Sequence, residues 1–351
     1  MRKIIWLLLV ILLVASCSKD DDYEPFLYDN PELIFNTPAG FPEMNSSFYT
    51  NRPTKYGVIL GEILFSDKRL SADNTISCAS CHNQASAFAD NNIQAVGIEG
   101  RIGLRNTPPI QNLAFMRFYN WDGSKLNLES QPLVPIITHE EMASSILEVI
   151  GKISGDNDYI NLFKKTFGDE TITPERIYIS IAQYEYTLVS ANSKYDRVKR
   201  NEATFTENEM QGYHVFQQKC IACHSTELFT DQTFRNIGFP INPNSNEAGR
   251  ARVTGDMNDY MSFRVPSLRN AEYTAPYGSF GQFSTLREVL DYFDNGVLEA
   301  DNLDLILKNN GNRIPLTEQE KKDIISFLKT AERSEERRVG KECRSRWSPY
   351  H

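Results

Sequence analysis

The chain has 351 residues, of which 40% are hydrophobic and 24% are charged, and its formal net charge is −9. This is the composition of an ordinary globular protein, and the length suffices for two modest domains. The excess of acidic residues argues against nucleic acid as a partner, and it favours a basic partner protein wherever charge steers the encounter.

The first 16 residues are typical of a secretory signal, with a basic start and an apolar run from Ile4 to Ala15. The run is short for a transmembrane span. It ends in Leu-Val-Ala-Ser-Cys, which resembles a bacterial lipobox, so Cys17 is predicted to be lipidated and to become the mature N-terminus. The alternative is an ordinary signal peptide with an incidental cysteine. The lipobox predicts an exported periplasmic or cell-surface lipoprotein of a Gram-negative bacterium.

Two further stretches are predicted to lie outside the folded body. Residues 17–53 are polar and rich in Asp, Asn and Pro, which predicts a tether between the membrane and the body. Residues 334–351 are basic and lack apolar periodicity, and they are predicted to be a tail that is not native to the protein. The folded body is therefore expected over residues 54–333.

In the first half, apolar residues at helical spacing predict three helices, over residues 56–64, 140–153 and 174–188. The first of these leads the chain to Cys78. Between residues 83 and 134, Gly and Pro residues interrupt the periodicity, which predicts loops. Thr173 and Pro174 supply the N-cap and a first-turn proline for the third helix.

The second half repeats this plan after a junction at residues 192–201. Capping boxes, in which a Thr is followed three residues later by Glu, are predicted to begin helices at Thr206 and Thr317. Ser284 is predicted to cap a third helix that ends at Gly296. Because strand-like alternation is scarce, the fold class is predicted to be all-α, with long connecting loops between the helices.

Four of the six cysteines form two C-x-x-C-H motifs, Cys78-Ala79-Ser80-Cys81-His82 and Cys220-Ile221-Ala222-Cys223-His224. Two thiols one helical turn apart can bond the two vinyl groups of one porphyrin, while the adjacent histidine binds the iron. One motif can arise by chance, but two in an exported chain predict two covalent c-type haems. The alternative is a zinc site of four thiolates, which leaves both histidines without a role.

Further motifs surround the cysteine pairs: Leu60-Gly61, Asp67-Lys68-Arg69-Leu70-Ser71, Arg105-Asn106-Thr107-Pro108, Trp121-Asp122-Gly123, Phe263-Arg264-Val265-Pro266-Ser267-Leu268-Arg269-Asn270 and Thr274-Ala275-Pro276-Tyr277. On these motifs the chain resembles the bacterial dihaem cytochrome c peroxidases and their MauG-like relatives, over about residues 54–330. The resemblance implies two cytochrome c-like domains. Residues 54–200 would hold a peroxidatic haem and residues 201–333 an electron-transfer haem.

The resemblance also implies three catalytic residues, Trp121, Gln131 and Glu141, which stand at the family's ten-residue intervals. Glu141 would be the base that moves a proton between the two oxygens of peroxide. Trp121 would relay electrons between the haems. Without the resemblance, Glu141 would be interpreted as a solvated carboxylate and Trp121 as a core residue.

The axial ligands of the two irons differ from those of many family members. Many place a displaceable histidine in the stretch that matches residues 96–100, where this chain has none. The haem on His82 is therefore expected to be open and to react without prior reduction, as in the MauG-like branch. The alternative is that His139 swings in as a ligand.

The sixth ligand of the second haem stays open at this point. The family has Met or Tyr at the position that matches Phe293, whose side chain cannot bind iron. Tyr292 is one residue away, and Met257 and Met261 lie upstream. Each of these three is also a common packing residue.

One interdomain calcium ion is implied as well. By resemblance it would be held by the side-chain oxygen of Asn106 and the carbonyl oxygens of Thr274 and Pro276, which are hard donors suited to this ion. Without the resemblance these residues would be interpreted as an Asx-turn and a loop.

The resulting hypothesis is a dihaem cytochrome c peroxidase that reduces hydrogen peroxide to water. Its electrons would come from a small donor protein, a cytochrome c or a cupredoxin. Two alternatives stay open: a MauG-like oxidase that modifies a partner protein, and a dihaem electron carrier without catalysis. The predicted partners also include the membrane, through lipidated Cys17, and a second copy of the chain in a homodimer, but no nucleic acid.

Overall fold

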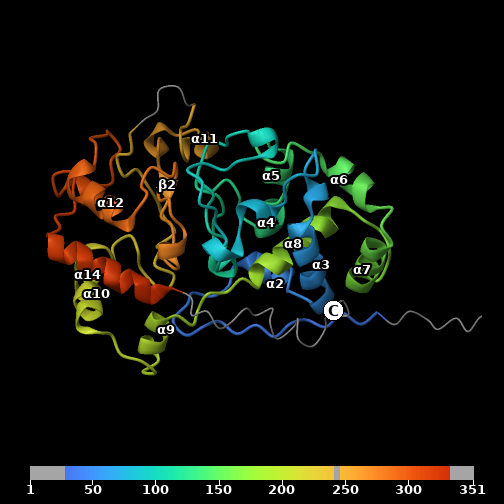
Figure 1. The fold of residues 1–351 in the computed structure, drawn as a ribbon, viewed down its shortest axis with the longest axis horizontal. Coiled ribbons are helices and arrows are strands. Elements are labelled where there is room, and N and C mark those ends of the chain that lie inside the picture. Colours follow the sequence, from blue (N-terminus) through green and yellow to red (C-terminus); the bar gives the residue numbers. More distant parts are fainter. Residues whose placement is uncertain (1–27, 241–245, 333–351) are drawn as a thin grey trace, which may run out of the picture.

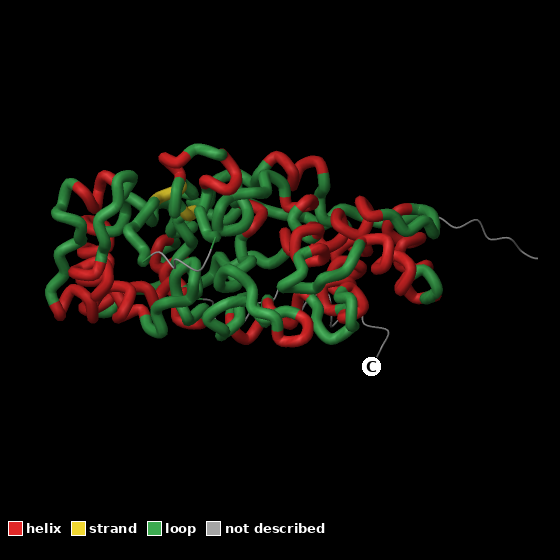
Figure 2. Tube along the Cα trace, turned by 90° about the horizontal axis from the view of Figure 1, so that it is seen from above, coloured by secondary structure: helices red, strands yellow, loops and turns green. Residues whose placement is uncertain are grey.

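The computed structural model describes residues 28–240 and 246–332. The predicted signal peptide, lipidation at Cys17 and the predicted tail at residues 334–351 therefore lie outside the described residues. The described chain forms two halves that lie side by side along the long axis of the molecule (Figure 1). Short helices alternate with long loops throughout, as Figure 2 shows from above. Within the described ranges, no helix combines the length and the apolar character needed to span a bilayer.

The first half is helical and builds one core. Its helices are α2 (Ser46–Thr50), α3 (Lys55–Ser66), α4 (Cys78–Cys81), α5 (Leu133–Ile137), α6 (Ile146–Ile153), α7 (Asn157–Phe167) and α8 (Pro174–Tyr186). The helix α3 packs against α7 and α8. Leu60 and Leu64 of α3 and Ile181 of α8 are buried in the shared core. Thr173 caps α8 as predicted, because its side chain accepts a hydrogen bond from the backbone of Arg176.

The second half is built around one helix pair. Its elements are α9 (Lys194–Lys199), α10 (Glu207–Lys219), α11 (Ala251–Thr254), α12 (Leu286–Asp291), α13 (Leu305–Lys308), α14 (Glu318–Leu328) and the two-residue antiparallel strands β1 (Phe234–Arg235) and β2 (Phe263–Arg264). The helices α10 and α14 pack against each other around Phe216 and Phe327. Both predicted capping boxes, at Thr206 and Thr317, are confirmed.

In each half, one glycine lets the two long helices approach closely. A Cβ atom at Gly61 in α3 would lie 1.9 Å from the carbonyl oxygen of Ser180 in α8. A Cβ atom at Gly212 in α10 would lie 1.9 Å from the carbonyl oxygen of Asp323 in α14. Because real Cβ atoms do not approach an oxygen this closely, any larger residue would push the helices apart.

The loops that follow are equivalent in the two halves. Asn112 and Asn270 both adopt the left-handed backbone conformation, with φ of 61° and 60°, and both precede a 3₁₀ turn. Isolated bridges then close the same loop in each half, Tyr119 with Lys125 and Tyr277 with Phe283. Each residue of the first-half loop is separated from its second-half equivalent by the same number of residues: Asn112 from Asn270, Tyr119 from Tyr277, and Lys125 from Phe283. The two halves are therefore structural repeats of one another in this region.

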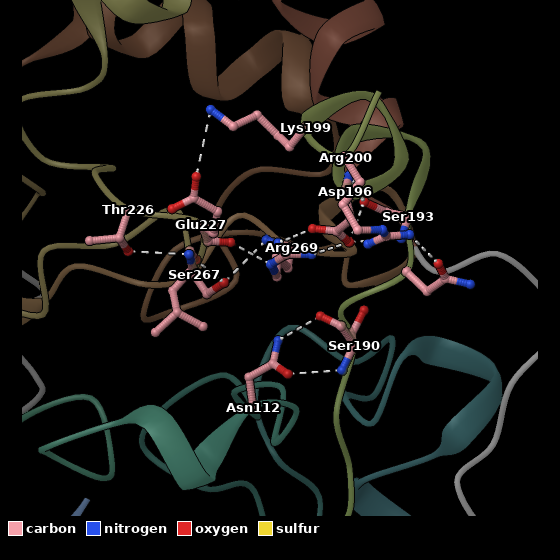
Figure 3. Close-up of polar contacts among 12 residues, drawn as sticks. Asn112, Ser190, Ser193, Asp196, Lys199, Arg200, Thr226, Glu227, Ser267 and Arg269 are labelled. Atoms are coloured by element: carbon pink, nitrogen blue, oxygen red, sulfur yellow. Dashed lines mark hydrogen bonds and ion pairs between the residues drawn. The ribbon is translucent and has the colours of Figure 1, made fainter. Parts of the chain in front are cut away.

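A buried ion pair joins the junction between the halves to the second half (Figure 3). Arg269 Nη2 lies 2.6 Å from Asp196 Oδ1, and Nη1 lies 3.0 Å from Oδ2. Nearby, the backbone nitrogen of Ser190 donates to Asn112 Oδ1 at 2.8 Å, and Asn112 Nδ2 donates back to the Ser190 carbonyl at 3.2 Å. Charged and neutral hydrogen bonds thus hold the junction to both halves.

The part of the predicted tether that the structure describes, residues 28–53, packs on the body. Phe41, Met44 and Phe48 are buried in the core of the first half. The guanidinium carbon of Arg269 also lies 4.7 Å from the centre of the Phe41 ring. The tether prediction is therefore wrong for this stretch, because its polar average composition concealed apolar residues that reach the core.

The helix expected over residues 140–153 is shorter than predicted. It begins at Ile146, because the Ser145 side chain accepts a hydrogen bond from a first-turn backbone nitrogen and acts as the N-cap. The preceding residues, Glu141 among them, form turns. This difference matters for the site, since a turn and a helix present a carboxylate in different directions.

The helix predicted to begin at Ser284 also differs in detail. Thr285 rather than Ser284 is its N-cap. The α-helix ends at Asp291 and continues as a π-helical turn, Tyr292–Gly296. Such turns are rare and frequently occur at functional sites.

Candidate functional site

Each C-x-x-C-H motif follows the first long helix of its half. Cys78–Cys81 form the single turn α4, and Cys220–Cys223 continue from the end of α10. All four cysteines are free. Burial raises the pKa of Cys81 and of Cys223 to about 11, so both thiols are uncharged. Uncharged thiols in a buried setting fit conversion to thioethers.

The two cysteine pairs do not come together. They lie in different halves of the molecule. In the part of the chain that the structure describes, no cluster of three or more His, Cys, Asp or Glu side chains could hold a metal ion. The described residues therefore do not form the four-thiolate zinc site that was the alternative for these motifs.

Both motif histidines have the same environment. His82 Nδ1 lies 3.0 Å from the Phe88 carbonyl oxygen, and His224 Nδ1 lies 2.9 Å from the Phe229 carbonyl oxygen. A carbonyl oxygen only accepts, so Nδ1 carries the proton and Nε2 keeps its lone pair. Burial lowers the pKa of both rings and keeps them neutral. Both histidines therefore fit the role of axial ligand through Nε2.

The carbonyls of Phe88 and Phe229 were missed by sequence reasoning. Both residues adopt the left-handed backbone conformation, with φ of 58° and 55°. No Gly or Asn marks these positions, so no sequence signal for that conformation was present. The only clue available was that each Phe follows its motif histidine by a few residues.

An open pocket of about 530 Å³ adjoins the first motif. Its walls include Cys78, Cys81, His82, Gln131, Glu141 and Glu185. Gln131 and Glu141 thus lie at the first motif, as the resemblance implied.

The turn that carries Glu141 is held by the neighbouring loop. The backbone nitrogen of Ile98 donates to the Glu141 carbonyl at 3.0 Å. A Cβ atom at Gly97 would lie 2.1 Å from the Glu140 carbonyl oxygen, so only glycine fits there. Burial, and then the charge of Glu140, raise the pKa of Glu141 to about 6. A carboxyl with this pKa can take up and return a proton near neutral pH.

His139, the alternative ligand, does not line this pocket. Its side chain is 71% exposed, and its Nδ1 lies 3.5 Å from Glu140 Oε1. The backbone carbonyl of His139 accepts a hydrogen bond from Arg101 Nη1 at 2.9 Å. In this structure His139 is therefore a surface residue.

A second pocket, of about 510 Å³, includes residues of both halves. Trp121 lies on its wall and is only 8% exposed. The indole nitrogen donates to the Asn106 carbonyl at 2.8 Å, and the Trp121 carbonyl accepts from the Arg264 backbone nitrogen at 2.8 Å. Pro108 and Pro266, which are equivalent in the two repeats, line the same pocket. Trp121 is therefore held between the halves.

Arg264 has a buried guanidinium on the wall of this second pocket. Its Nη1 has no hydrogen-bond partner, and no carboxylate pairs with it among the described residues. Burial lowers the pKa of Arg264 to about 10. Because a buried cation without a counter-ion is costly, this guanidinium fits an anionic group such as a haem propionate. Arg264 belongs to the motif at residues 263–270, but the sequence alone indicated no role for it.

Comparisons with known proteins agree with this geometry. A family model described as di-haem cytochrome c peroxidase matches residues 55–204. The methylamine utilization protein MauG of Methylorubrum extorquens is 34% identical over 303 residues, which cover 84% of this chain and 82% of the relative. The chain belongs to the dihaem cytochrome c peroxidase family. Membership in this family implies two c-type haems, and the resemblance drawn from the motifs is confirmed.

Other members of this family and solved structures are similar as well. The cytochrome c551 peroxidase of Nitrosomonas europaea is 33% identical over 279 residues, which cover 77% of this chain and 78% of the relative. A MauG-like protein associated with microbial copper homeostasis has a TM-score of 0.78 at 29% identity, covering 86% of this chain and 96% of that chain. BthA, a diheme peroxidase of Burkholderia thailandensis, has a TM-score of 0.71 at 21% identity, covering 87% of this chain and 94% of that chain. At this identity the similarity supports a shared fold and nothing further.

The residues considered for the second haem's sixth position have different environments. The hydroxyl of Tyr292 donates to the Ile237 carbonyl at 2.8 Å, so it already has a partner. Met257 is exposed at the surface. Met261 is buried in the apolar cluster that also contains Tyr292 and Phe293. The position that the family uses for a ligand is thus part of an apolar cluster.

Of the residues predicted to hold calcium, Asn106 contacts the loop that follows the other two in the chain. Asn106 is buried, and its backbone nitrogen donates to the Ser279 carbonyl at 2.9 Å. Its Nδ2 donates to the Asn92 carbonyl at 2.9 Å. The loop that ends at Ser279 contains Thr274 and Pro276. The structure brings Asn106 to this loop, and the calcium ion itself stays a prediction.

Proposed function

We propose that the chain is an oxidoreductase that reduces hydrogen peroxide to two waters, with two electrons from a small cytochrome c or cupredoxin and two protons from solvent. The observation that carries this proposal is the first pocket. There, a neutral imidazole on His82 and a carboxyl with a raised pKa, Glu141, lie on the walls of one cavity. When bound, the haems would supply the redox chemistry, and the protein would supply ligation, proton transfer and spacing.

The residues that would hold the two haems are equivalent in the two halves. Cys78, Cys81, Cys220 and Cys223 would form the thioethers, and His82 and His224 would be the axial ligands. The two haem domains would be residues 54–200 and 201–333. Arg264 supports this assignment, because its unpaired guanidinium offers a counter-charge to a propionate.

Glu141 would be the base of the reaction. An ionised Glu141 accepts the proton of the bound peroxide and returns it to the departing oxygen. Gln131, whose Nε2 lies 3.4 Å from Asn120 Oδ1, would orient the peroxide from the same wall. Trp121, between the halves, would be the relay for electrons. Its hydrogen bond to the Asn106 carbonyl supports this role, since it holds the indole in place.

Several finer assignments rest on sequence patterns. One calcium ion would bind Asn106 and the carbonyls of Thr274 and Pro276. Cys17 would anchor the exported protein to a membrane, in the periplasm or at the cell surface. A homodimer would be its assembly. Metal analysis would test the calcium ion, and mass spectrometry of the N-terminus would test lipidation of Cys17. Sedimentation would test the homodimer.

A second function has specific support. The chain is as similar to MauG of Methylorubrum extorquens as to the cytochrome c551 peroxidase of Nitrosomonas europaea. No described histidine other than His82 lines the first pocket. A MauG-like oxidation of a partner protein would use the same open pocket. It would differ from peroxidase activity in taking its electrons from that partner's side chains.

The experiment that tests the proposal mixes ferric, haem-loaded protein with hydrogen peroxide and follows the Soret band by stopped flow. We expect a fast change in the wild type and a rate lower by about 10²–10⁴-fold in Glu141→Gln, because general base catalysis contributes this much. Glu43→Gln is the matched control, since Glu43 is an exposed carboxyl that does not line the first pocket. If neither ferric nor reduced wild-type protein reacts, the chain is an electron carrier and the proposal is wrong.

A further inference from the structure

A second carboxyl, Glu185, lies on the wall of the first pocket, together with Cys78 and Glu141. It belongs to the last turn of α8, which packs against α3. Its side chain is 5% exposed. The function proposed above gives this residue no role.

Glu185 has no partner for its charge. It forms no hydrogen bond or ion pair through its side chain with any residue in the described ranges, and Oε2 is completely enclosed. Glu129, close by, differs: its Oε1 accepts from Asn51 Nδ2 at 2.9 Å and from the Tyr186 hydroxyl at 3.0 Å. The fold thus supplies donors to the partly buried carboxylate of Glu129 and leaves the buried carboxyl of Glu185 unpaired. A buried carboxylate without a partner is strongly disfavoured, so Glu185 is stable there only as the neutral acid.

The titratable groups around Glu185 do not stabilise its ionised form. Glu129 and Tyr119 lie on one side, Cys78 lies beside it, and Glu141 and His82 line the same pocket. None of these described groups is a cation at neutral pH. Burial, and then the charge of Glu129, raise the pKa of Glu185 to about 8, whereas that of Glu141 is about 6. At pH 7 the pocket therefore holds one protonated and one mostly ionised carboxyl. Environments that push the titration of two acids apart are the usual basis for distinct acid and base roles.

We propose that Glu185 is the proton store of the first pocket: it holds a proton at neutral pH and releases it into the pocket when peroxide is reduced. Overall, hydrogen peroxide takes up two electrons and two protons, the O–O bond breaks, and two waters form. Glu141 only moves the proton that peroxide already carries. Glu185 supplies one of the two additional protons and is reprotonated from solvent, and the electrons come from the reduced donor protein. This inference rests on the function proposed above.

The first test is redox-difference infrared spectroscopy of the haem-loaded protein. In the wild type, reduction should change the C=O stretch of a protonated carboxylic acid, and that band should shift in D₂O. The band should be lost in Glu185→Gln, which has the same shape but no exchangeable acid proton. It should persist in Glu185→Asp and in Glu43→Gln, a control at an exposed carboxyl. A band that is absent from the wild type, or unchanged in Glu185→Gln, would overturn the proposal.

The second test is the pH dependence of the first haem's midpoint potential. Loss of the proton from Glu185 adds a negative charge that stabilises the ferric state, so the potential should fall as pH rises through about 8. Glu185→Gln should lose this slope, and Glu43→Gln should keep it. If Glu185 had only a structural role, the midpoint potential of Glu185→Gln would keep the pH dependence of the wild type, and the proposal would be wrong. Because neither test requires peroxide, a wild-type protein with the band and the slope but no reaction with peroxide would refute the proposed peroxidase and leave the proton store standing.

Discussion

The two halves share a scaffold but differ in the side chains at equivalent positions. Each has a glycine between its long helices, a C-x-x-C-H motif and a histidine that is paired with a Phe carbonyl. At positions equivalent to Gln131 and Pro135 of the first pocket, the second half has Val289 and Phe293. The comparison teaches that the fold repeats the setting of the motif histidine, whereas the polar Gln131 of the first pocket is matched by the apolar Val289 in the second half.

The largest expected effect falls on the second half, to which both Arg269 and the helix α9 with Asp196 belong. Arg269→Ala would leave Asp196 buried without its partner, which costs about 3–5 kcal/mol. We expect urea unfolding of the haem-loaded protein to shift to lower concentration and to divide into two transitions. Arg52→Ala is the control, because its ion pair with Glu32 is exposed and is worth at most about 1 kcal/mol. A single transition at the wild-type midpoint would show that this ion pair does not stabilise the second half.

The helix pairs provide a symmetric test of the repeat. Gly61→Ala and Gly212→Ala each place a Cβ atom against a carbonyl oxygen of the facing helix and should each cost about 1–3 kcal/mol. Gly151→Ala in α6, where nothing lies within 4 Å, should be neutral or slightly stabilising. Unequal losses at the two equivalent glycines, measured by thermal unfolding, would show that the halves are less alike in energy than in shape.

The pH dependence of the peroxide reaction should reflect the polar pocket. Glu141 acts as a base only when it is ionised, and its pKa is about 6. The rate constant for the Soret change should therefore be constant above pH 7 and fall about tenfold per pH unit below the pKa. A profile that stays flat between pH 7 and pH 4, at constant haem occupancy, would exclude Glu141 as the base.

The smallest expected effect comes from a substitution that introduces a haem ligand into the second half. Phe293→Met places a thioether at the position equivalent to Pro135, in the apolar cluster that also contains Met261. We expect electron paramagnetic resonance of the ferric protein to show more low-spin iron, because Met is a haem ligand. Leu290→Met, at a buried site in the preceding helix α12, should leave the spectrum unchanged. An unaltered spectrum in Phe293→Met would place the second haem's distal side elsewhere.

Features that depend on neighbours along the chain were predictable from the sequence. The two C-x-x-C-H motifs, the caps at Thr173, Thr206 and Thr317 and the family itself follow from residue types at short, regular spacing. These patterns act within one or two turns of backbone, so no knowledge of the rest of the fold is needed to interpret them.

Only the tertiary structure decided which polar groups are left without partners. Contacts between distant segments decide three features: the start of α6 after Glu141, the packing of residues 28–53, and the absence of a described counter-ion at Arg264 and of a described hydrogen-bond partner at Glu185. Nothing in the local sequence distinguishes Glu185 from Glu129, which has two hydrogen-bond donors. The physical reason is that the cost of burying a charge depends on the groups that the fold brings around it.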